Sequence, residues 1–174
     1  MKILGILRHA KSDWGQSDKR DFDRGLNARG RKGAALMGQH IRDHGIKWGK
    51  LLASPAERVQ VTLREARLGV EPQWDQRLYL ASTETIGDVI RECAGDAEAL
   101  LVAGHNPGLA DLVFDIVDPE NENSLFDEAK VKFPTAAFAV FELDIDDWTE
   151  LADGCGRLVH FTRPRDLDPE LGPQ

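Results

Sequence analysis

Cysteine is scarce in this chain of 174 residues. Cys93 and Cys155 are the two present, and neither lies in a Cys-x-x-Cys pair or beside a group of histidines. Two cysteines cannot form a disulfide framework, so a hydrophobic core must hold the fold together. This cysteine usage is typical of a reducing compartment, and we expect a cytoplasmic protein.

Long apolar runs are missing as well. The N-terminus offers only Ile3 to Leu7 before Arg8, which is too short for a signal peptide or a membrane span, so we expect no membrane partner. The length fits one domain, which we place at residues 1–163. Three prolines and one glycine fall within the last eleven residues, and we expect residues 164–174 to be a flexible tail.

The chain also lacks a positive net charge and a phosphate-binding glycine loop. A formal charge of −8 argues against nucleic acid as a partner. No GxxxxGK[ST] motif is present, so nucleotide binding of the P-loop type has no support. Acidic residues crowd the second half, as at 118–128, while basic residues gather in the first 32 positions. This asymmetry would suit a small anionic ligand, although we interpret Arg29, Arg31 and Lys32 as the coat of a helix surface.

Apolar runs and capping signals predict an alternation of strands and helices. Two helix starts are expected at Ser54-Pro55 and Asn106-Pro107, where a capping side chain precedes a proline. Asn27 is expected to cap a third helix. The acidic stretch 119–132 is expected to be a loop that forms a partial lid. The predicted strands are 2–7, 50–53, 99–103, 136–143 and 157–162, and the predicted helices are 27–44, one from 54 onward, 83–93 and 106–117. The fold class is α/β, a three-layer α/β/α sandwich with a mostly parallel sheet and an antiparallel edge.

Cations and imidazoles follow each of the first three strands. Arg8 and His9 come after the first strand, Arg58 lies one turn into the helix after the second, and His105 follows the third. Ligands of such sheets bind outside the carboxyl ends of the strands, where these side chains would meet. A helical side chain leans toward the N-terminus, so the Arg58 guanidinium can return to this edge, and its planar fork suits phosphate oxygens. The sequence therefore predicts a phosphate site.

Other interpretations of the histidines stay open at this point. His9 and His105 could be structural residues whose hydrogen bonds are made within the fold, and Arg58 could be a surface residue. The two histidines could also bind a metal, but flanking arginines repel a cation, so we expect no metal and no cofactor. His40 and His44 lie four residues apart on a predicted helix, and we assign no function to them or to His160.

At these positions the chain resembles the histidine phosphatase (phosphoglycerate mutase-like) superfamily, and within it the SixA-type phosphohistidine phosphatases. The resemblance runs through most of the chain in the right order. It is carried by the segments Leu7-Arg8-His9-Ala10-Lys11-Ser12, Asp23-Arg24-Gly25-Leu26-Asn27 with Gly30, Ser54-Pro55 with Arg58 and Thr62, Gly104-His105-Asn106-Pro107-Gly108, and Phe133-Pro134-Thr135-Ala136.

The resemblance implies a role for each matching residue. His9 would be the nucleophile, Arg8, Arg58 and His105 would form the phosphate pocket, and Arg24 would be an additional phosphate contact. Ala10 departs from the glycine of many members. No residue matches the acid that many relatives use as proton donor, although Glu84 and Glu57 are available.

We expect neutral His9 to attack phosphorus and form a phosphohistidine intermediate that water hydrolyses, with Arg8, Arg58 and protonated His105 stabilising the charge. Without a strong acid, the pocket favours a labile P–N bond, so a phosphohistidine-bearing protein is the expected substrate and partner. The alternatives are a phosphatase of small phosphoesters and a non-catalytic phosphate-binding module.

Overall fold

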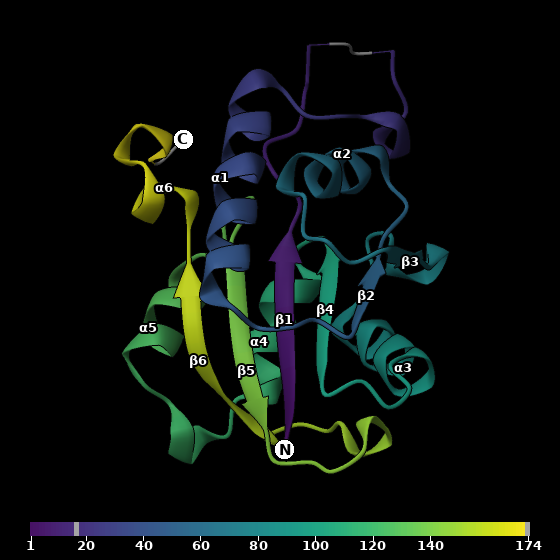
Figure 1. Cartoon of the computed structure of the whole chain (residues 1–174), viewed down its shortest axis with the longest axis vertical. Helices are drawn as coiled ribbons and strands as arrows, with labels where there is room; N and C mark the ends of the chain where they lie inside the picture. Colours follow the sequence, from purple (N-terminus) through teal and green to yellow (C-terminus); the bar gives the residue numbers. More distant parts are fainter. Residues whose placement is uncertain (16–17, 173–174) are drawn as a thin grey trace.

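The computed structural model describes residues 1–15 and 18–172, and a six-stranded sheet lies at its centre (Figure 1). The strand order is β3-β2-β4-β1-β5-β6. Strands β3, β2, β4 and β1 are parallel, while β5 pairs antiparallel with β1 and with the edge strand β6. The bounds are β1 Lys2–Arg8, β2 Lys50–Ala53, β3 Pro72–Trp74, β4 Ala99–Gly104, β5 Phe138–Leu143 and β6 Gly156–Thr162. The mostly parallel sheet is confirmed.

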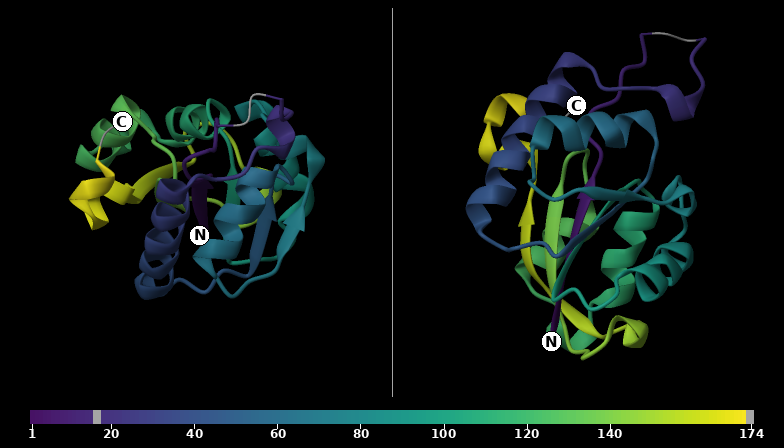
Figure 2. Two further views of the ribbon diagram at one scale, coloured as in Figure 1. Left: turned by 90° about the horizontal axis from the view of Figure 1, so that it is seen from above. Right: turned by 45° about the vertical axis from the view of Figure 1, so that its right-hand side comes forward.

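Helices cover both faces of the sheet, which confirms the three-layer architecture (Figure 2). On one face, α1 (Ala28–His44) and α2 (Glu57–Ala66) bury Met37, Ile41 and Val59 against the strands. On the other face, α3 (Thr83–Cys93), α4 (Gly108–Ile116) and α5 (Ser124–Val131) bury a larger apolar cluster. In the described residues, no helix combines the length and apolar character needed to cross a bilayer.

The structure confirms one of the three predicted helix caps. Asn27 caps α1 as expected, because its Oδ1 accepts a hydrogen bond from the Gly30 amide at 2.8 Å. The starts at Ser54-Pro55 and Asn106-Pro107 are wrong: α2 begins at Glu57 and α4 at Gly108, without a side-chain cap. The Ser54 hydroxyl lies 2.8 Å from His105 Nε2, and the Asn106 amide donates to the Phe133 carbonyl at 2.8 Å. The side chains of Ser54 and Asn106 thus make tertiary hydrogen bonds and do not cap the two helices.

The acidic segment expected as an irregular loop is also corrected. It contains the 3-10 turn η3 (Pro119–Asn121) and the helix α5. Asn123 caps α5 through a hydrogen bond from the Phe126 amide at 2.9 Å, and Phe126 and Ala129 are buried. Because α5 packs against α4 and β6, this segment belongs to a helical layer instead of forming a lid.

The C-terminal tail has a folded conformation in the structure. It forms α6 (Pro164–Leu167) and the 3-10 turn η5 (Pro169–Leu171) beside α1. Lys32 Nζ lies 3.0 Å from the Asp168 carboxylate, and Arg29 donates to the Glu170 carbonyl at 2.7 Å. Two cations that we interpreted as a plain surface coat thus hold this tail. Its flexibility, and the domain boundary at residue 163, stay predictions.

Candidate active site

The backbone of His9 is fixed by two distant parts of the chain. Its amide donates to the Gly104 carbonyl at the end of β4 at 3.1 Å, and its carbonyl accepts from the Ala136 amide at 2.9 Å. Ala136 adopts a left-handed conformation with a φ of 60°, uncommon for a residue other than glycine. The position of His9 therefore depends on β1, β4 and the segment that leads into β5.

Thr62 and Gly30 bring the two helices of the first face to the same edge. The Thr62 hydroxyl donates to the Arg58 carbonyl at 2.6 Å and accepts from the Ala10 amide at 2.9 Å, so it joins α2 to the residue after His9. A Cβ on Gly30 would lie 2.1 Å from the Lys11 carbonyl oxygen. Only glycine permits this close approach of α1 to the loop after β1.

The imidazole of His9 is buried and neutral. Its Nδ1 lies 2.7 Å from the Ala10 carbonyl oxygen and must donate to it, which leaves the lone pair on Nε2. Burial, and then the charges of Arg8, His105 and Arg58, lower the pKa of His9 to about 3 against the opposing effect of the Ala10 hydrogen bond. A neutral imidazole with a free Nε2 is the form a nucleophile requires.

His105 lies beside His9, with their ring centroids 5.3 Å apart. Burial and then the charge of Arg58 lower the pKa of His105 to about 4, so the protonated His105 that we expected is wrong for this structure. The Ser54 hydroxyl accepts from the Ala56 amide at 3.3 Å and can donate to His105 Nε2. That tautomer places an N–H on Nδ1, which is buried without a hydrogen-bond partner in the described chain.

Two arginines complete the group that the sequence predicted. Arg8 donates from Nη1 to the Phe133 carbonyl at 3.1 Å, while its Nε is buried and makes no hydrogen bond within the described residues. Arg58 donates from Nη1 to the Asp21 carbonyl at 2.9 Å and from Nη2 to the Asp21 carboxylate at 3.0 Å. Burial and the charge of Arg58 lower the pKa of Arg8. The structure thus brings Arg8, His9, Arg58 and His105 together.

Asp21 and Tyr79 belong to this site and were missed. The Tyr79 hydroxyl donates to the Asp21 carboxylate at 2.5 Å, and the Tyr79 ring meets His105 edge to face at 5.5 Å. Partial burial raises the pKa of Asp21, but hydrogen bonds from Tyr79 and Arg58 lower it overall, so Asp21 is an ionised acceptor. Nothing in the sequence distinguishes Asp21 from its acidic neighbours, whereas the single tyrosine of the chain was an available signal.

Arg24, which the resemblance implies as an additional phosphate contact, binds the loop that follows β1. Arg24 donates to the carbonyls of Asp13 at 3.4 Å and Lys19 at 3.2 Å, and its guanidinium lies 4.0 Å from the Trp14 ring centroid, so it holds the loop together. Its phosphate contact stays a prediction.

The two acidic candidates lie at helix starts. Glu84 is exposed in the first turn of α3 and lines a separate cavity with Arg91, and its role as proton donor stays a prediction. Glu57 lies in the first turn of α2, where a carboxylate suits the helix dipole.

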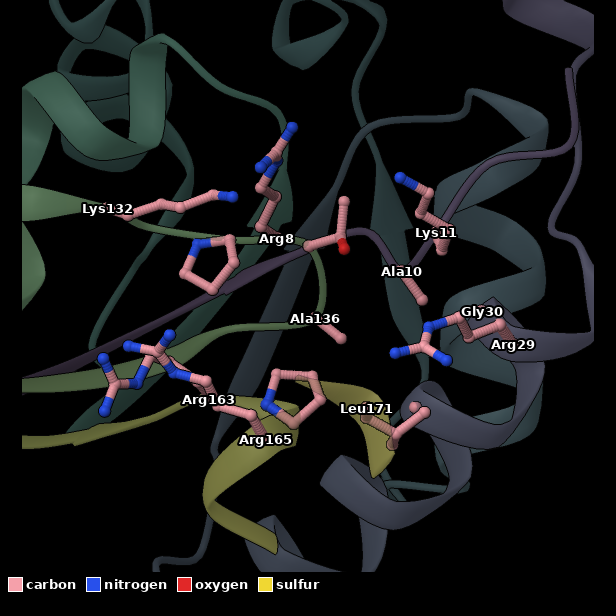
Figure 3. A pocket seen from close by; sticks show the side chains of 14 residues that line it. Arg8, Ala10, Lys11, Arg29, Gly30, Lys132, Ala136, Arg163, Arg165 and Leu171 are labelled. Carbon is pink, nitrogen blue, oxygen red and sulfur yellow. The ribbon is translucent and has the colours of Figure 1, made fainter. Parts of the chain in front are cut away.

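A basic pocket of about 300 Å³ opens beside Arg8. Figure 3 shows Lys132 and Arg29 pointing into it from opposite sides. No aspartate or glutamate lines it among the described residues, although the whole chain carries a charge of −8. Its cations are Arg8, Lys11, Arg29, Lys132, Arg163 and Arg165, and its other walls are formed by Pro134, Thr135, Ala136, Pro164 and Leu171.

Comparison with known proteins places this geometry in a family. The family model of the histidine phosphatase superfamily (branch 1) matches residues 4–79. The Mycobacterium tuberculosis protein MT1313 is 31% identical over 160 residues, which is 91% of this chain and 100% of that protein.

Two solved structures share the whole fold. A SixA protein of Nakamurella multipartitia, to which phosphohistidine phosphatase activity is ascribed, has a TM-score of 0.81 at 26% identity and covers 94% of this chain and 96% of its own. The corresponding SixA protein of Agrobacterium tumefaciens has a TM-score of 0.76 at 26% identity and covers 94% and 98%. This chain therefore belongs to the histidine phosphatase superfamily, as a phosphatase of the SixA type.

Proposed function

We propose that this protein removes the phosphoryl group from phosphohistidine on another protein, with His9 as nucleophile. The observation that carries the proposal is the state of His9. Its Nδ1 donates to Ala10, its Nε2 holds the lone pair, and its pKa of about 3 keeps it neutral. The positive charges of Arg8 and Arg58 lie close enough to lower that pKa, and the same charges would attract a phosphoryl group.

The reaction has two displacements at phosphorus. In the first, the substrate ring carries a proton on its other nitrogen, and the Nε2 lone pair of His9 forms a P–N bond. The P–N bond of the substrate breaks, and its electron pair leaves with the substrate ring as neutral imidazole. In the second, a water oxygen attacks phosphorus and loses a proton, the bond to Nε2 breaks, and inorganic phosphate leaves neutral His9. Arg8, Arg58 and the Nδ1–H of neutral His105 stabilise the equatorial oxygens in both steps.

The acid–base character of the site supports phosphohistidine over an ordinary phosphoester. An alkoxide leaving group benefits from a general acid by roughly 10²–10⁴-fold, whereas a leaving imidazole is itself basic and needs less help. The carboxyl group that enters this site is Asp21, and it is ionised and accepts hydrogen bonds from Tyr79 and Arg58. It therefore has no proton to donate.

The basic pocket supports a substrate that carries further negative charge beside its phosphoryl group. Arg8 belongs both to the phosphate site and to the lining of this pocket, so a ligand can extend from one into the other. In a phosphoprotein, an acidic segment next to the phosphohistidine would meet Lys132 and Arg165 there. Rim charges of this kind set specificity and association rate.

A second candidate is a small phosphorylated molecule with additional acidic groups. The volume of the basic pocket, about 300 Å³, favours it, because that space suits a compact polyanion. Such a substrate would need its proton from Glu84 or from water, since Asp21 is ionised.

The deciding experiment compares initial rates on a phosphohistidine protein and on a panel of small phosphoesters. We expect kcat/KM for the phosphohistidine protein to exceed that for every ester. If esters react at least as well, the proposal that phosphohistidine is the substrate is wrong. Binding of vanadate without hydrolysis of either class would instead identify a non-catalytic phosphate-binding module.

A further inference from the structure

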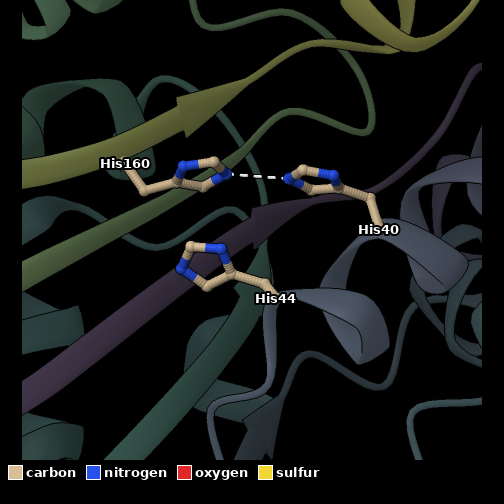
Figure 4. Close-up of side chains that lie close together, drawn as sticks. All are labelled: His40, His44 and His160. Atoms are coloured by element: carbon tan, nitrogen blue, oxygen red, sulfur yellow. Dashed lines mark hydrogen bonds between the residues drawn. The ribbon is translucent and has the colours of Figure 1, made fainter.

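A second group of histidines lies away from the phosphate site. His40 and His44 occupy successive turns near the C-terminal end of α1, and His160 lies on the edge strand β6 (Figure 4). More than a hundred residues separate His160 from the other two in the sequence. The packing of α1 over the sheet brings the three imidazoles to one place.

The three side chains converge at the distances of a metal site. One ring nitrogen from each residue lies within 4.8 Å of the other two, and the Nε2 atoms of His40 and His160 are 2.8 Å apart. A tetrahedral zinc ion about 2.0–2.1 Å from each ligand spaces its nitrogens about 3.3 Å apart. The His40–His160 distance is shorter than this value and the other two are at most 4.8 Å, so modest rotations of the rings would satisfy it.

The exposure of one of the three residues makes that adjustment possible. His44 is exposed and stacks on His160 with ring centroids 4.2 Å apart, so its ring can turn at little cost. His40 and His160 are half-buried, and the Thr162 hydroxyl lies 3.2 Å and 2.8 Å from their Nε2 atoms. Two ligands are thus partly fixed by packing, while the third is free to complete the group.

The charges around these histidines also suit a cation. The charged groups that act on His40 are His44 and the carboxylate of Asp43, and those that act on His160 are His44 and His40. Arginines surround His9 and His105 instead, and they would repel a metal ion. Imidazole suits Zn²⁺, Co²⁺, Ni²⁺ and Cu²⁺, and a His-x-x-x-His pair on a helix is a common start of a zinc site.

We propose that His40, His44 and His160 bind one divalent transition-metal ion, such as Zn²⁺, through their imidazole nitrogens. Three protein ligands leave a fourth tetrahedral position for water or another small ligand. The bound ion joins α1 to β6, and β6 continues directly into Arg163 of the basic pocket. An ion that binds the folded chain in this way raises its stability.

The test is titration of the metal-depleted full chain with Zn²⁺ by calorimetry, with Co²⁺ as a spectroscopic substitute. We expect one ion per chain, tetrahedral Co²⁺ absorption, and a higher Tm with Zn²⁺. His44→Ala and His160→Ala should each weaken Zn²⁺ binding by about tenfold or more and remove the Tm increase. His44 is exposed, so its substitution leaves folding intact, which circular dichroism checks.

Two control variants test whether Zn²⁺ binding is specific to these three histidines. Gln39→Ala alters an exposed neighbour on α1 and should keep the affinity and the Tm increase. His9→Ala alters the other histidine pair and should also keep both. Zn²⁺ binding that is absent in the unaltered chain, unchanged in His44→Ala and His160→Ala, or lost in His9→Ala overturns the proposal.

Discussion

The molecule holds two groups of close histidines, and they differ in what surrounds them. His9 and His105 lie at the carboxyl ends of β1 and β4, buried among arginines. His40, His44 and His160 lie between α1 and an edge strand, partly exposed, with Asp43 as the charged neighbour from outside the group. The side chain is the same in both places.

Neighbouring charge therefore decides what an imidazole can do in this protein. Burial first, and then the charges of Arg8 and Arg58, keep His9 neutral. The same two arginines disfavour a metal cation, so an anion is the ligand that fits. In the second group the nitrogens converge, and no arginine is among the charged groups of the described residues that act on His40 and His160. The predictions below test this difference, in order of decreasing effect.

His9→Ala is expected to cause the largest loss. Turnover of a phosphohistidine protein should fall by about 10⁴-fold or more, because the substitution removes the proposed nucleophile. The variant should also lose acid-labile labelling by a phosphoryl donor, which a single-turnover experiment measures. Persistent labelling would show that His9 is not the nucleophile. A simultaneous loss of Zn²⁺ affinity would show that the two histidine groups do not act independently.

Arg58→Lys keeps the charge but removes the planar fork that binds Asp21 and that we propose to bind phosphate oxygens. We expect kcat/KM to fall by about 10²–10³-fold, with a small change in the free energy of unfolding. Arg64→Lys, at an exposed position of the same helix, is the matched control and should change neither quantity. An equal loss of activity and stability in Arg58→Lys would indicate a structural role.

The lowered pKa values predict how stability depends on pH. The folded chain excludes a proton from His9 until about pH 3, whereas the unfolded chain binds it near pH 6.5. The free energy of unfolding should therefore decrease as the pH falls from about 6.5 toward 4, by up to about 1.4 kcal/mol per pH unit for each such histidine. Urea unfolding at several pH values measures this slope. His9→Ala should show a smaller slope than the unaltered chain, and equal slopes would refute the buried neutral state.

Arg165→Glu reverses one exposed charge of the basic pocket and should have the smallest effect. We expect kcat/KM for a phosphohistidine protein with acidic flanking residues to fall by about fivefold, mainly through KM. The rate on a small phosphoramidate should change much less, and Arg64→Glu, outside the pocket, is the charge control. Equal losses of kcat/KM on both substrates would show that the pocket takes no part in the recognition of a phosphoprotein.

Most strands and helices could be predicted from local pattern, and the exceptions have a common cause. The strands β2 and β4 and the helices α1 and α3 follow apolar runs and caps that act over a few residues. Ser54 and Asn106 failed as caps because their side chains bond to His105 and to Phe133, which are distant in sequence. The helix α5 was missed because its buried face is short and its sequence is acidic.

The sequence alone was enough to predict that Arg8, His9, Arg58 and His105 would share one edge of the sheet, because each follows a parallel strand and such strands end together. It could not predict that Asp21 and Tyr79 join them, that α6 and the cations Lys132 and Arg165 build a pocket beside Arg8, or that His160 meets His40 and His44. These depend on how a loop, a tail and an edge strand pack against the layers. Such contacts join positions that no local pattern relates, so they follow from the tertiary structure and not from the sequence pattern.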